Sequence, residues 1–497
     1  MKKKFLSIVF LLFAVSQSIK AAPPTLAQND FYPMHTTHYP FGFLNVNRKE
    51  YEKGLTSKSI FERVQMSASV FGQKATRGHN QDKKHDEETT TTASNYKDGV
   101  PAGDIYGRWN MLGLLYGNVP TGQTRAALLT TAAALTYHDG QRLDHPNYSD
   151  TSDWLGHFTI PLEYRKMGAR FQFSTRLFND VIIQLEGGIT DLKQSYSTFT
   201  DLGRTKHTYS DDAAAKTGYS SVTGTTTDLT NANVISNHDT IETNLMDNHA
   251  LIFSQMGLGI LDFHETAAED VFLSLIWRHN HHVNNPDDDF VHDYEYEDDE
   301  EWDKFILTPF LKLSGIIGIG KERDNTKAFS ITTGNNGHHG ISLTFGFSMD
   351  FYKSIEMAWE AGVSNFFKRR ISGLYVPTDE RQTGVFPFKT DVNYEPGKTW
   401  HFSFAMNAHH FTDKLSCFAQ YLFVNHGKDS ISLVTADSAF KPSVLEDVTK
   451  WSVQAANIGL NYDLSPHMSV GFTWQAPITR RGAYKTNCVM FSLTGTF

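Results

Sequence analysis

The chain of 497 residues contains only two cysteines, Cys417 and Cys488, which are too few for a disulfide-based scaffold. Its N-terminus nevertheless predicts export. Consecutive lysines precede an apolar stretch over residues 5–15, and small residues that suit cleavage follow. This order is typical of a secretory signal peptide, so we predict that residues 1–21 are removed from the mature protein.

The chain also lacks long hydrophobic runs. The apolar part of the signal is shorter than the roughly 20 residues that a membrane-crossing helix needs, and no later segment is apolar enough. The formal net charge of -10 makes nucleic acid an unfavourable partner. Mean hydropathy is -0.38, yet aromatic residues make up 13% of the sequence. This combination fits a membrane barrel, in which only alternate residues of each strand face lipid.

Catalytic motifs are missing as well. The sequence contains no G-x-S-x-G elbow, no H-E-x-x-H pair and no P-loop, so we predict neither an enzyme nor a bound cofactor. Residues 278–301 combine histidines with many carboxylates, but their spacing matches neither a zinc site nor a calcium loop. A solvated acidic loop and weak binding of divalent cations are both open for this segment, and no metal site is predicted.

What the sequence has in abundance is two-residue alternation of apolar and polar side chains. From Ile341 to Met349, apolar residues occupy every odd position and polar or small residues every even one. Similar segments of about ten residues, the length of a tilted strand that crosses a bilayer, predict an all-β, antiparallel transmembrane barrel of about 14–16 strands. The candidate strands are residues 64–70, 105–116, 126–137, 154–165, 169–177, 181–190, 250–261, 271–279, 305–320, 341–349, 355–363, 400–408, 415–425, 451–464, 468–474 and 489–497.

From residue 305 to the C-terminus, the connections between these segments differ in length in a regular way, whereas further back residues 195–248 and 281–303 would both fall on the short-turn side. Short turns alternate with long polar stretches, which is the pattern of periplasmic turns and extracellular loops in membrane barrels. In residues 241–261, apolar and polar side chains alternate poorly. We therefore expect that this segment is not a wall strand but a helix folded into the lumen. The short turns are residues 351–354, 410–414 and 465–467, and the long stretches are residues 321–338, 367–398 and 427–450.

The last candidate strand ends at Phe497, with Val489, Phe491 and Leu493 on the same face. Together with the export signal and the many short strands, it resembles the Gram-negative outer-membrane β-barrels of porin type. The resemblance is one of pattern and involves no family motif. It implies a location in the bacterial outer membrane, contact with outer-membrane lipid, and recognition of Phe497 by the barrel-assembly machinery. A homotrimer is implied by analogy at the level of the fold.

The implied organisation has three parts. Residues 1–21 are the signal peptide, residues 22–58 form an extended N-terminal segment or a small plug, and residues 59–497 form the barrel. Charged residues on the strands should face the lumen, because a charge that faces lipid at the bilayer midplane costs about 2–4 kcal/mol. The predicted pore-lining residues are Arg63, Glu163, Arg165, Arg170, Arg176, Glu186, Lys312, Glu356, Glu360 and His401.

These residues form either a mutually paired wall without selectivity or a charged constriction that selects solutes by sign. Barrels of 16–18 strands enclose an aqueous channel, so the main functional prediction is passive diffusion of small hydrophilic solutes. One alternative is a plugged or selective transporter of hydrophobic compounds, with residues 195–261 or the N-terminal segment in the lumen. The other is a structural or host-contact protein that acts through its long loops.

Overall fold

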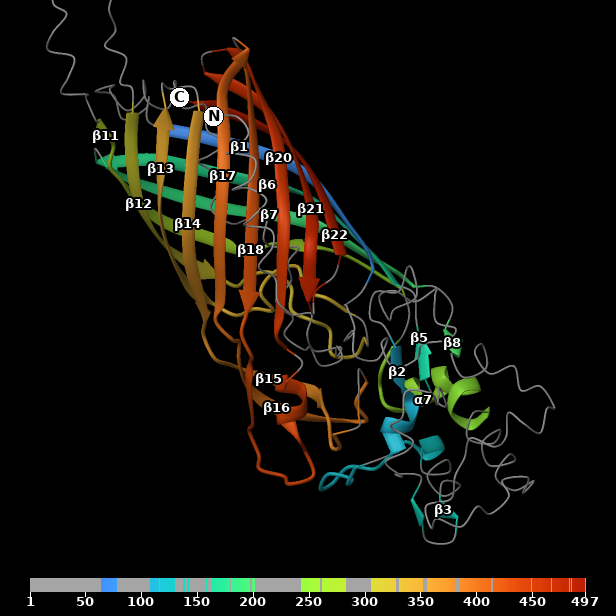
Figure 1. Cartoon of the computed structure of the whole chain (residues 1–497). Coiled ribbons are helices and arrows are strands. Elements are labelled where there is room, and N and C mark those ends of the chain that lie inside the picture. Colours follow the sequence, from blue (N-terminus) through green and yellow to red (C-terminus); the bar gives the residue numbers. More distant parts are fainter. Residues whose placement is uncertain are drawn as a thin grey trace, which may run out of the picture.

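The structure is a computed structural model of the chain (Figure 1). It describes residues 64–77, 108–115, 117–129, 137–138, 141–142, 157–159, 162–178, 180–196, 199–201, 243–259, 262–282, 305–327, 330–351 and 355–496, apart from 381, 383–384, 413, 448, 466, 482 and 484. The predicted signal peptide, the predicted N-terminal segment up to residue 58, Arg63 and Phe497 lie outside these residues.

Twelve antiparallel strands of the described chain form a closed barrel. Neighbours in the sequence pair around the wall, β22 pairs with β1, and β7 pairs with β10 to close the ring. The wall strands are β1 (Val64–Arg77), β6 (Leu162–Phe178), β7 (Val181–Tyr196), β10 (Val271–Arg278), β12 (Phe305–Ile317), β13 (Gly340–Phe351), β14 (Ile355–Phe366), β17 (Thr399–Thr412), β18 (Leu415–His426), β20 (Trp451–Ser465), β21 (Met468–Arg481) and β22 (Lys485–Thr496).

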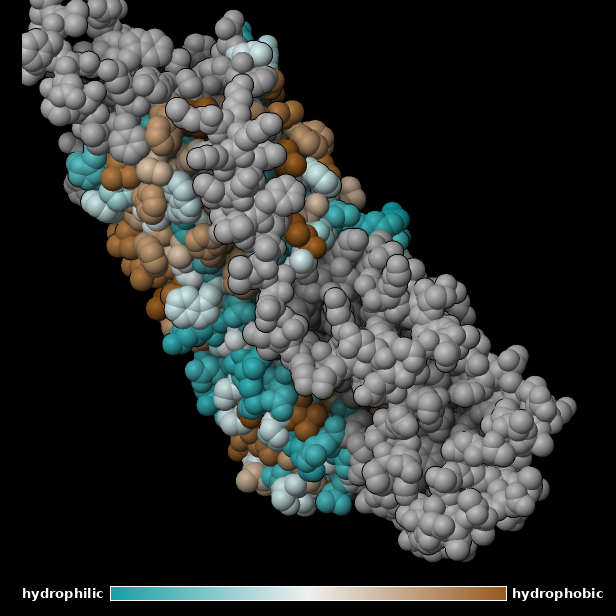
Figure 2. Space-filling view, viewed as in Figure 1, coloured by the Kyte–Doolittle hydropathy of each residue, from teal (hydrophilic) through white to brown (hydrophobic). Residues whose placement is uncertain are grey.

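The two faces of the wall follow the alternation in the sequence. On β13, Ile341 is 49% and Phe345 59% exposed, whereas Ser342 and Thr344 between them are buried. Apolar side chains that face out in this way suit lipid, and polar side chains that face in suit the lumen. Figure 2 shows brown apolar residues over much of the wall and teal hydrophilic residues below them, toward the end with the long connections.

One wall strand is built from several pieces. β9 (Phe263–Ala268) pairs with β7 on the side of β10 nearer the long connections, and β11 (His281–His282) pairs with β12 on the opposite side. Ala268 pairs with Ile189 of β7, and Phe272 pairs with Glu186. The step between these two pairs is therefore four residues in this strand but only three in β7. The extra residue is a β-bulge, which lets two successive side chains, Glu269 and Asp270, both be buried.

The long connections build a layer beyond one end of the barrel (Figure 1). Apart from the segment between β10 and β12, short turns join the strands at the opposite end, so this is the extracellular end. Within the described ranges, no helix is both long and apolar enough to cross a membrane. The elements of the layer are β2 (Arg108–Asn110), β3 (Tyr137–His138), β4 (Gln141–Arg142), β5 (His157–Thr159), β8 (Thr200–Asp201), β15 (Arg369–Val376), β16 (Phe388–Glu395), β19 (Ser430–Leu433), the short helices η5 (Met111–Leu115) and η8 (Thr243–Asp247), and the α-helices α7 (His249–Gln255) and α8 (Pro442–Asp447).

The antiparallel barrel is confirmed, but the predicted count of about 14–16 strands is too high. Residues 105–116 contain one short strand and a 3-10 helix, and the described part of 126–137 does not cross the wall. Residues 154–165 and 169–177 were separate candidates, yet β6 runs without a turn from Leu162 through the whole of the second one, and residues 157–159 form β5 in the extracellular layer. Residues 250–261 contain part of α7, which is a helix as expected but lies in the extracellular layer and not in the lumen.

Candidate functional site

A belt of charged side chains lines the inner face of the barrel. We call Lys166, Arg170, Glu186, Glu269, Asp270, Lys312, Glu356, Glu360 and His401 the polar belt, and all of them are buried. Lys312 on β12 illustrates how its members are satisfied. Its Nζ donates to Gln184 Oε1 at 3.0 Å and lies 3.8 Å from Glu186 Oε1. Lys312 is therefore paired within the barrel, and the whole belt is shielded from bulk water.

The β-bulge supplies the acidic centre of the belt. Glu269 accepts from Lys166 Nζ at 2.6 Å and from Arg170 Nε at 2.7 Å. The guanidinium carbon of Arg170 lies 3.9 Å from the centre of the Phe71 ring, within the range of a cation–π contact. One carboxylate thus bridges the two cations that β6 projects into the barrel.

Asp270, the second acid of the bulge, holds the connection between β12 and β13. It accepts hydrogen bonds from Gly320 N at 2.8 Å, from Asn335 N at 2.6 Å and from Asn335 Nδ2 at 2.7 Å. In addition, Lys166 Nζ donates a hydrogen bond to the backbone carbonyl oxygen of Thr333 at 3.4 Å. The connection is therefore fastened to the inner wall beside the Glu269 cluster.

The opposite part of the belt is rich in acids and carries a histidine. Along one row of the wall, Lys312, Thr344, Gly362 and His401 are successive cross-strand partners. His401 Nε2 lies 3.4 Å from Thr344 Oγ1 and 4.0 Å from Glu360 Oε1. A Cβ on Gly362 would come within 2.7 Å of His401 Nε2, so the glycine makes room for the imidazole ring.

Most of the predicted pore-lining residues fall on the inner face. Arg170, Glu186, Lys312, Glu356, Glu360 and His401 are buried there, and Arg176 is half-buried on the same side of β6 as Arg170. Their role in selecting solutes stays a prediction. Sequence reasoning missed Glu269 and Asp270 because the bulge interrupts the alternation on which it relied, and it missed Lys166 because it placed a turn there.

Glu163 and Arg165 do not face the lumen. Arg165 is 59% exposed, and it shares the outer face of β6 with Met167, which is 61% exposed. The prediction for these two residues is wrong because it placed a turn after Arg165. Since β6 continues unbroken, Lys166 and Arg170 face in, and Arg165 faces out.

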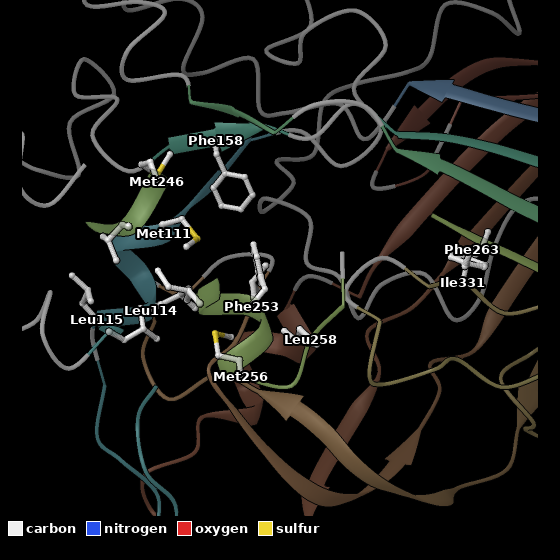
Figure 3. Close-up of a cluster of buried hydrophobic side chains, with 14 of the residues drawn as sticks. Met111, Leu114, Leu115, Phe158, Met246, Phe253, Met256, Leu258, Phe263 and Ile331 are labelled. Carbon is white, nitrogen blue, oxygen red and sulfur yellow. The ribbon is translucent and has the colours of Figure 1, made fainter. Parts of the chain in front are cut away.

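Apolar side chains line the inner face at the extracellular end. We call this set the apolar mouth: Ala75, Tyr164, Leu192, Phe263, Ile316, Phe366, Val424 and Val453 from the wall, with Ile331 from the connection between β12 and β13. Figure 3 shows Phe263 and Ile331 beside the barrel strands, and the other labelled side chains around α7 and β5 in the extracellular layer. The residues of the mouth belong to two apolar clusters, and each cluster continues into the extracellular layer.

A hydrogen-bonded chain at the extracellular rim has the residue types of a hydrolytic triad. Thr399 Oγ1 lies 2.8 Å from His426 Nδ1, and His426 Nε2 lies 2.8 Å from Asp429 Oδ1. All three side chains are buried, so a substrate has no access to the hydroxyl. Asp429 also accepts from Gly397 N at 2.6 Å and from Tyr394, which shows that the chain fastens the extracellular layer to the barrel rim.

Only residues 278–282 of the acidic, histidine-rich segment are described. There His279 Nδ1 lies 2.9 Å from Asp180 Oδ2, and the rings of His279 and His281 are 4.5 Å apart. Among the described residues, no group of three or more His, Cys, Asp or Glu side chains is placed to hold a metal ion. Both cysteines are free: Cys488 is buried and Cys417 half-buried.

Comparison with known proteins gives one family and several solved structures. Residues 301–493 match a family described as "Putative MetA-pathway of phenol degradation". No curated protein matches the chain. The chain is similar in structure to the COG4313 outer membrane channel from Pseudomonas putida F1, at 8% identity and a TM-score of 0.40, covering 88% of this chain and 96% of that one.

Two toluene transporters are more distant. TodX of Pseudomonas putida has 7% identity and a TM-score of 0.31, covering 97% of this chain and 99% of that one. TbuX of Ralstonia pickettii has 9% identity and a TM-score of 0.29, covering 89% of this chain and 91% of that one. At such scores these likenesses do not bear on what this chain transports. The closed barrel with its lipid-facing apolar surface spans the bacterial outer membrane.

Proposed function

We propose that this barrel is a channel that takes up small compounds that combine an apolar aromatic ring with a polar group, as phenols do. The observation that carries the proposal is the apolar mouth. Its side chains, such as Leu192 and Phe263, are buried on the inner face, where a pore for sugars or ions would present polar groups to water. Burial of about 150 Å² of a phenyl-sized solute there would be favourable by about 4 kcal/mol.

Two further features support an aromatic solute with one polar group. Met111, Met246 and Met256 lie in the apolar cluster on the extracellular side of the mouth, and flexible thioethers can repack around a small ligand. Further into the barrel from the mouth, the polar belt offers hydrogen-bond partners for a hydroxyl group. The family that matches residues 301–493 is described by phenol degradation, in agreement with this solute class.

The main sequence prediction, free diffusion of hydrophilic solutes, has less support. Twelve strands enclose a narrower space than the 16–18 strands of barrels with aqueous channels. The belt residues are also shielded from water, whereas the wall of a wide aqueous pore would be solvated.

Uptake of radiolabelled phenol at low concentration tests the proposal, in a Gram-negative host that lacks its own porins. We expect the wild-type channel to raise the rate above that of cells without it. Leu192→Asn should bring the rate back toward the background because it places a polar amide in the mouth, whereas Leu192→Met should keep the rate high. Heat-modifiable migration in gels checks that each variant forms a barrel. Equal uptake with and without the wild-type channel would refute the proposal.

A further inference from the structure

A row of basic side chains crosses four neighbouring strands on the outer face of the barrel. Lys74 on β1, Arg165 on β6, Lys193 on β7 and His264 on β9 are successive cross-strand partners. Partners of this kind have Cβ atoms about 4.5–5.5 Å apart. Their side chains point away from the barrel: Lys74 is 47%, Arg165 59% and His264 64% exposed, and Lys193 is exposed as well.

The row lies at the edge of the lipid-facing surface. Toward the middle of the barrel, the outer faces of the same strands carry Val70, Met167 and Ile189, which are 59%, 61% and 57% exposed. Lys74 is near the end of β1 that leads into a long connection, so the row is on the extracellular side. Its four side chains therefore lie at the level of the headgroups of the outer leaflet.

Nearby carboxylates leave part of this positive charge available. Glu163 accepts from Lys74 Nζ at 2.8 Å and from Arg165 Nε. It precedes Arg165 by two residues on β6 and so lies further from the middle of the membrane. Asp191 is held by His264 Nε2 at 2.6 Å and by Thr266 Oγ1 at 2.8 Å.

Among the described residues, no ion pair uses Lys193 Nζ or the terminal Nη atoms of Arg165. Asp262 is exposed and directly precedes β9. It comes two residues before His264, so it lies on the side of the row that is further from the membrane. The Nη atoms of Arg165 and the Nζ of Lys193, on exposed side chains, are therefore available to an anion at this level.

We infer that this row binds a phosphate-bearing headgroup of an outer-leaflet glycolipid. Like charges directly opposite each other on a sheet are destabilising unless an anion lies between them. A phosphate between Arg165 and Lys193 supplies that anion: the guanidinium fork matches two phosphate oxygens, and the ammonium adds a point charge. The site lies outside the lumen and does not depend on which solute the channel carries.

Native mass spectrometry of the purified full-length protein tests this inference. The probes are bis-phosphorylated lipid A and the same lipid after removal of both phosphates. The test variant is Arg165→Ala combined with Lys193→Ala. The matched control is Lys414→Ala, which removes an exposed cation at the opposite rim of the barrel.

We expect the wild type to bind the phosphorylated lipid roughly tenfold more tightly than the dephosphorylated one, since each cation near an anionic headgroup contributes. The double variant should lose this preference and Lys414→Ala should keep it, while phenol uptake stays unchanged in both. The inference is overturned if the double variant keeps the full preference for phosphate, if Lys414→Ala loses it equally, or if the wild type shows no preference.

Discussion

The ion cluster around Glu269 allows a sharp test of how the barrel wall is held together. Glu269→Gln keeps the size of the side chain but removes its charge. The carboxylate lies 2.6 Å from Lys166 Nζ and 2.7 Å from Arg170 Nε, and the three side chains are between 1% and 7% exposed. The substitution therefore leaves two cations in a desolvated position without their shared partner.

Breaking a buried ion pair by removing one partner costs about 3–5 kcal/mol, because the remaining charge stays buried. Asp270 follows Glu269 in the bulge and is also buried, and its charge offsets part of the loss. We therefore expect Glu269→Gln to lower the free energy of unfolding by about 3 kcal/mol, at the lower end of that range.

Urea unfolding in lipid vesicles, followed by tryptophan fluorescence, measures this difference. The matched control is Glu163→Gln, because Glu163 also joins two cations, Lys74 and Arg165, but on the exposed outer face. The control should lose less than about 1 kcal/mol, as exposed pairs do. Equal losses for Glu269→Gln and Glu163→Gln would refute the view that burial gives the inner cluster its strength.

Three further predictions concern the lumen and its extracellular connection. Asp270→Ala should release residues 318–339 and increase current fluctuations in planar bilayers; a current trace like the wild type's would contradict this. His338 lies near the end of this connection, with its Nδ1 2.9 Å from the carbonyl oxygen of Phe367, and burial lowers its pKa to about 4. Acidification from pH 7.5 to 5 should therefore favour the open connection, released from the barrel wall, over the closed one by about 2 kcal/mol, measured by hydrogen exchange, and His338→Gln should remove the effect. Gly362→Ala should displace the His401 ring and lower the free energy of unfolding by about 1–3 kcal/mol; an unchanged urea midpoint would contradict this.

The sign of the His338 effect follows from linkage. The open connection takes up a proton near the usual pKa of 6.5, but the closed one does so only near 4. Between these values the open state binds more protons, so closure loses stability as the pH falls through this window and regains it as the pH rises.

The lipid-facing surface could be predicted from the sequence because it is a local property. Each strand displays every second residue to lipid, so the pattern from Ile341 to Met349 identifies strand and face together. The same locality explains the errors. The residues near Lys166 and Gly168 do not reveal whether the chain continues as a strand or turns. The turn predicted there is absent from β6, and this one error assigned Arg165 to the wrong face.

The inner cluster could not be predicted, since its members come from distant parts of the chain. Arg170 and Glu269 are 99 residues apart, and they meet because β9 and β10 both pair with β7. Two successive acids look like a loop in the sequence, whereas in the barrel they mark a β-bulge. The extracellular layer was misread for another reason: short apolar runs in a packed core, such as Met111–Leu115, do not reveal whether they are strands or helices.

The most direct test of the proposed function compares two solutes in the same proteoliposomes. Efflux of phenol and swelling driven by arabinose are measured with the wild-type channel and with Leu192→Asn. We expect the wild type to accelerate phenol efflux with little swelling in arabinose, and Leu192→Asn to slow the efflux. Rapid swelling in arabinose, with phenol efflux no faster than in empty vesicles, would contradict the proposal and restore the hydrophilic pore.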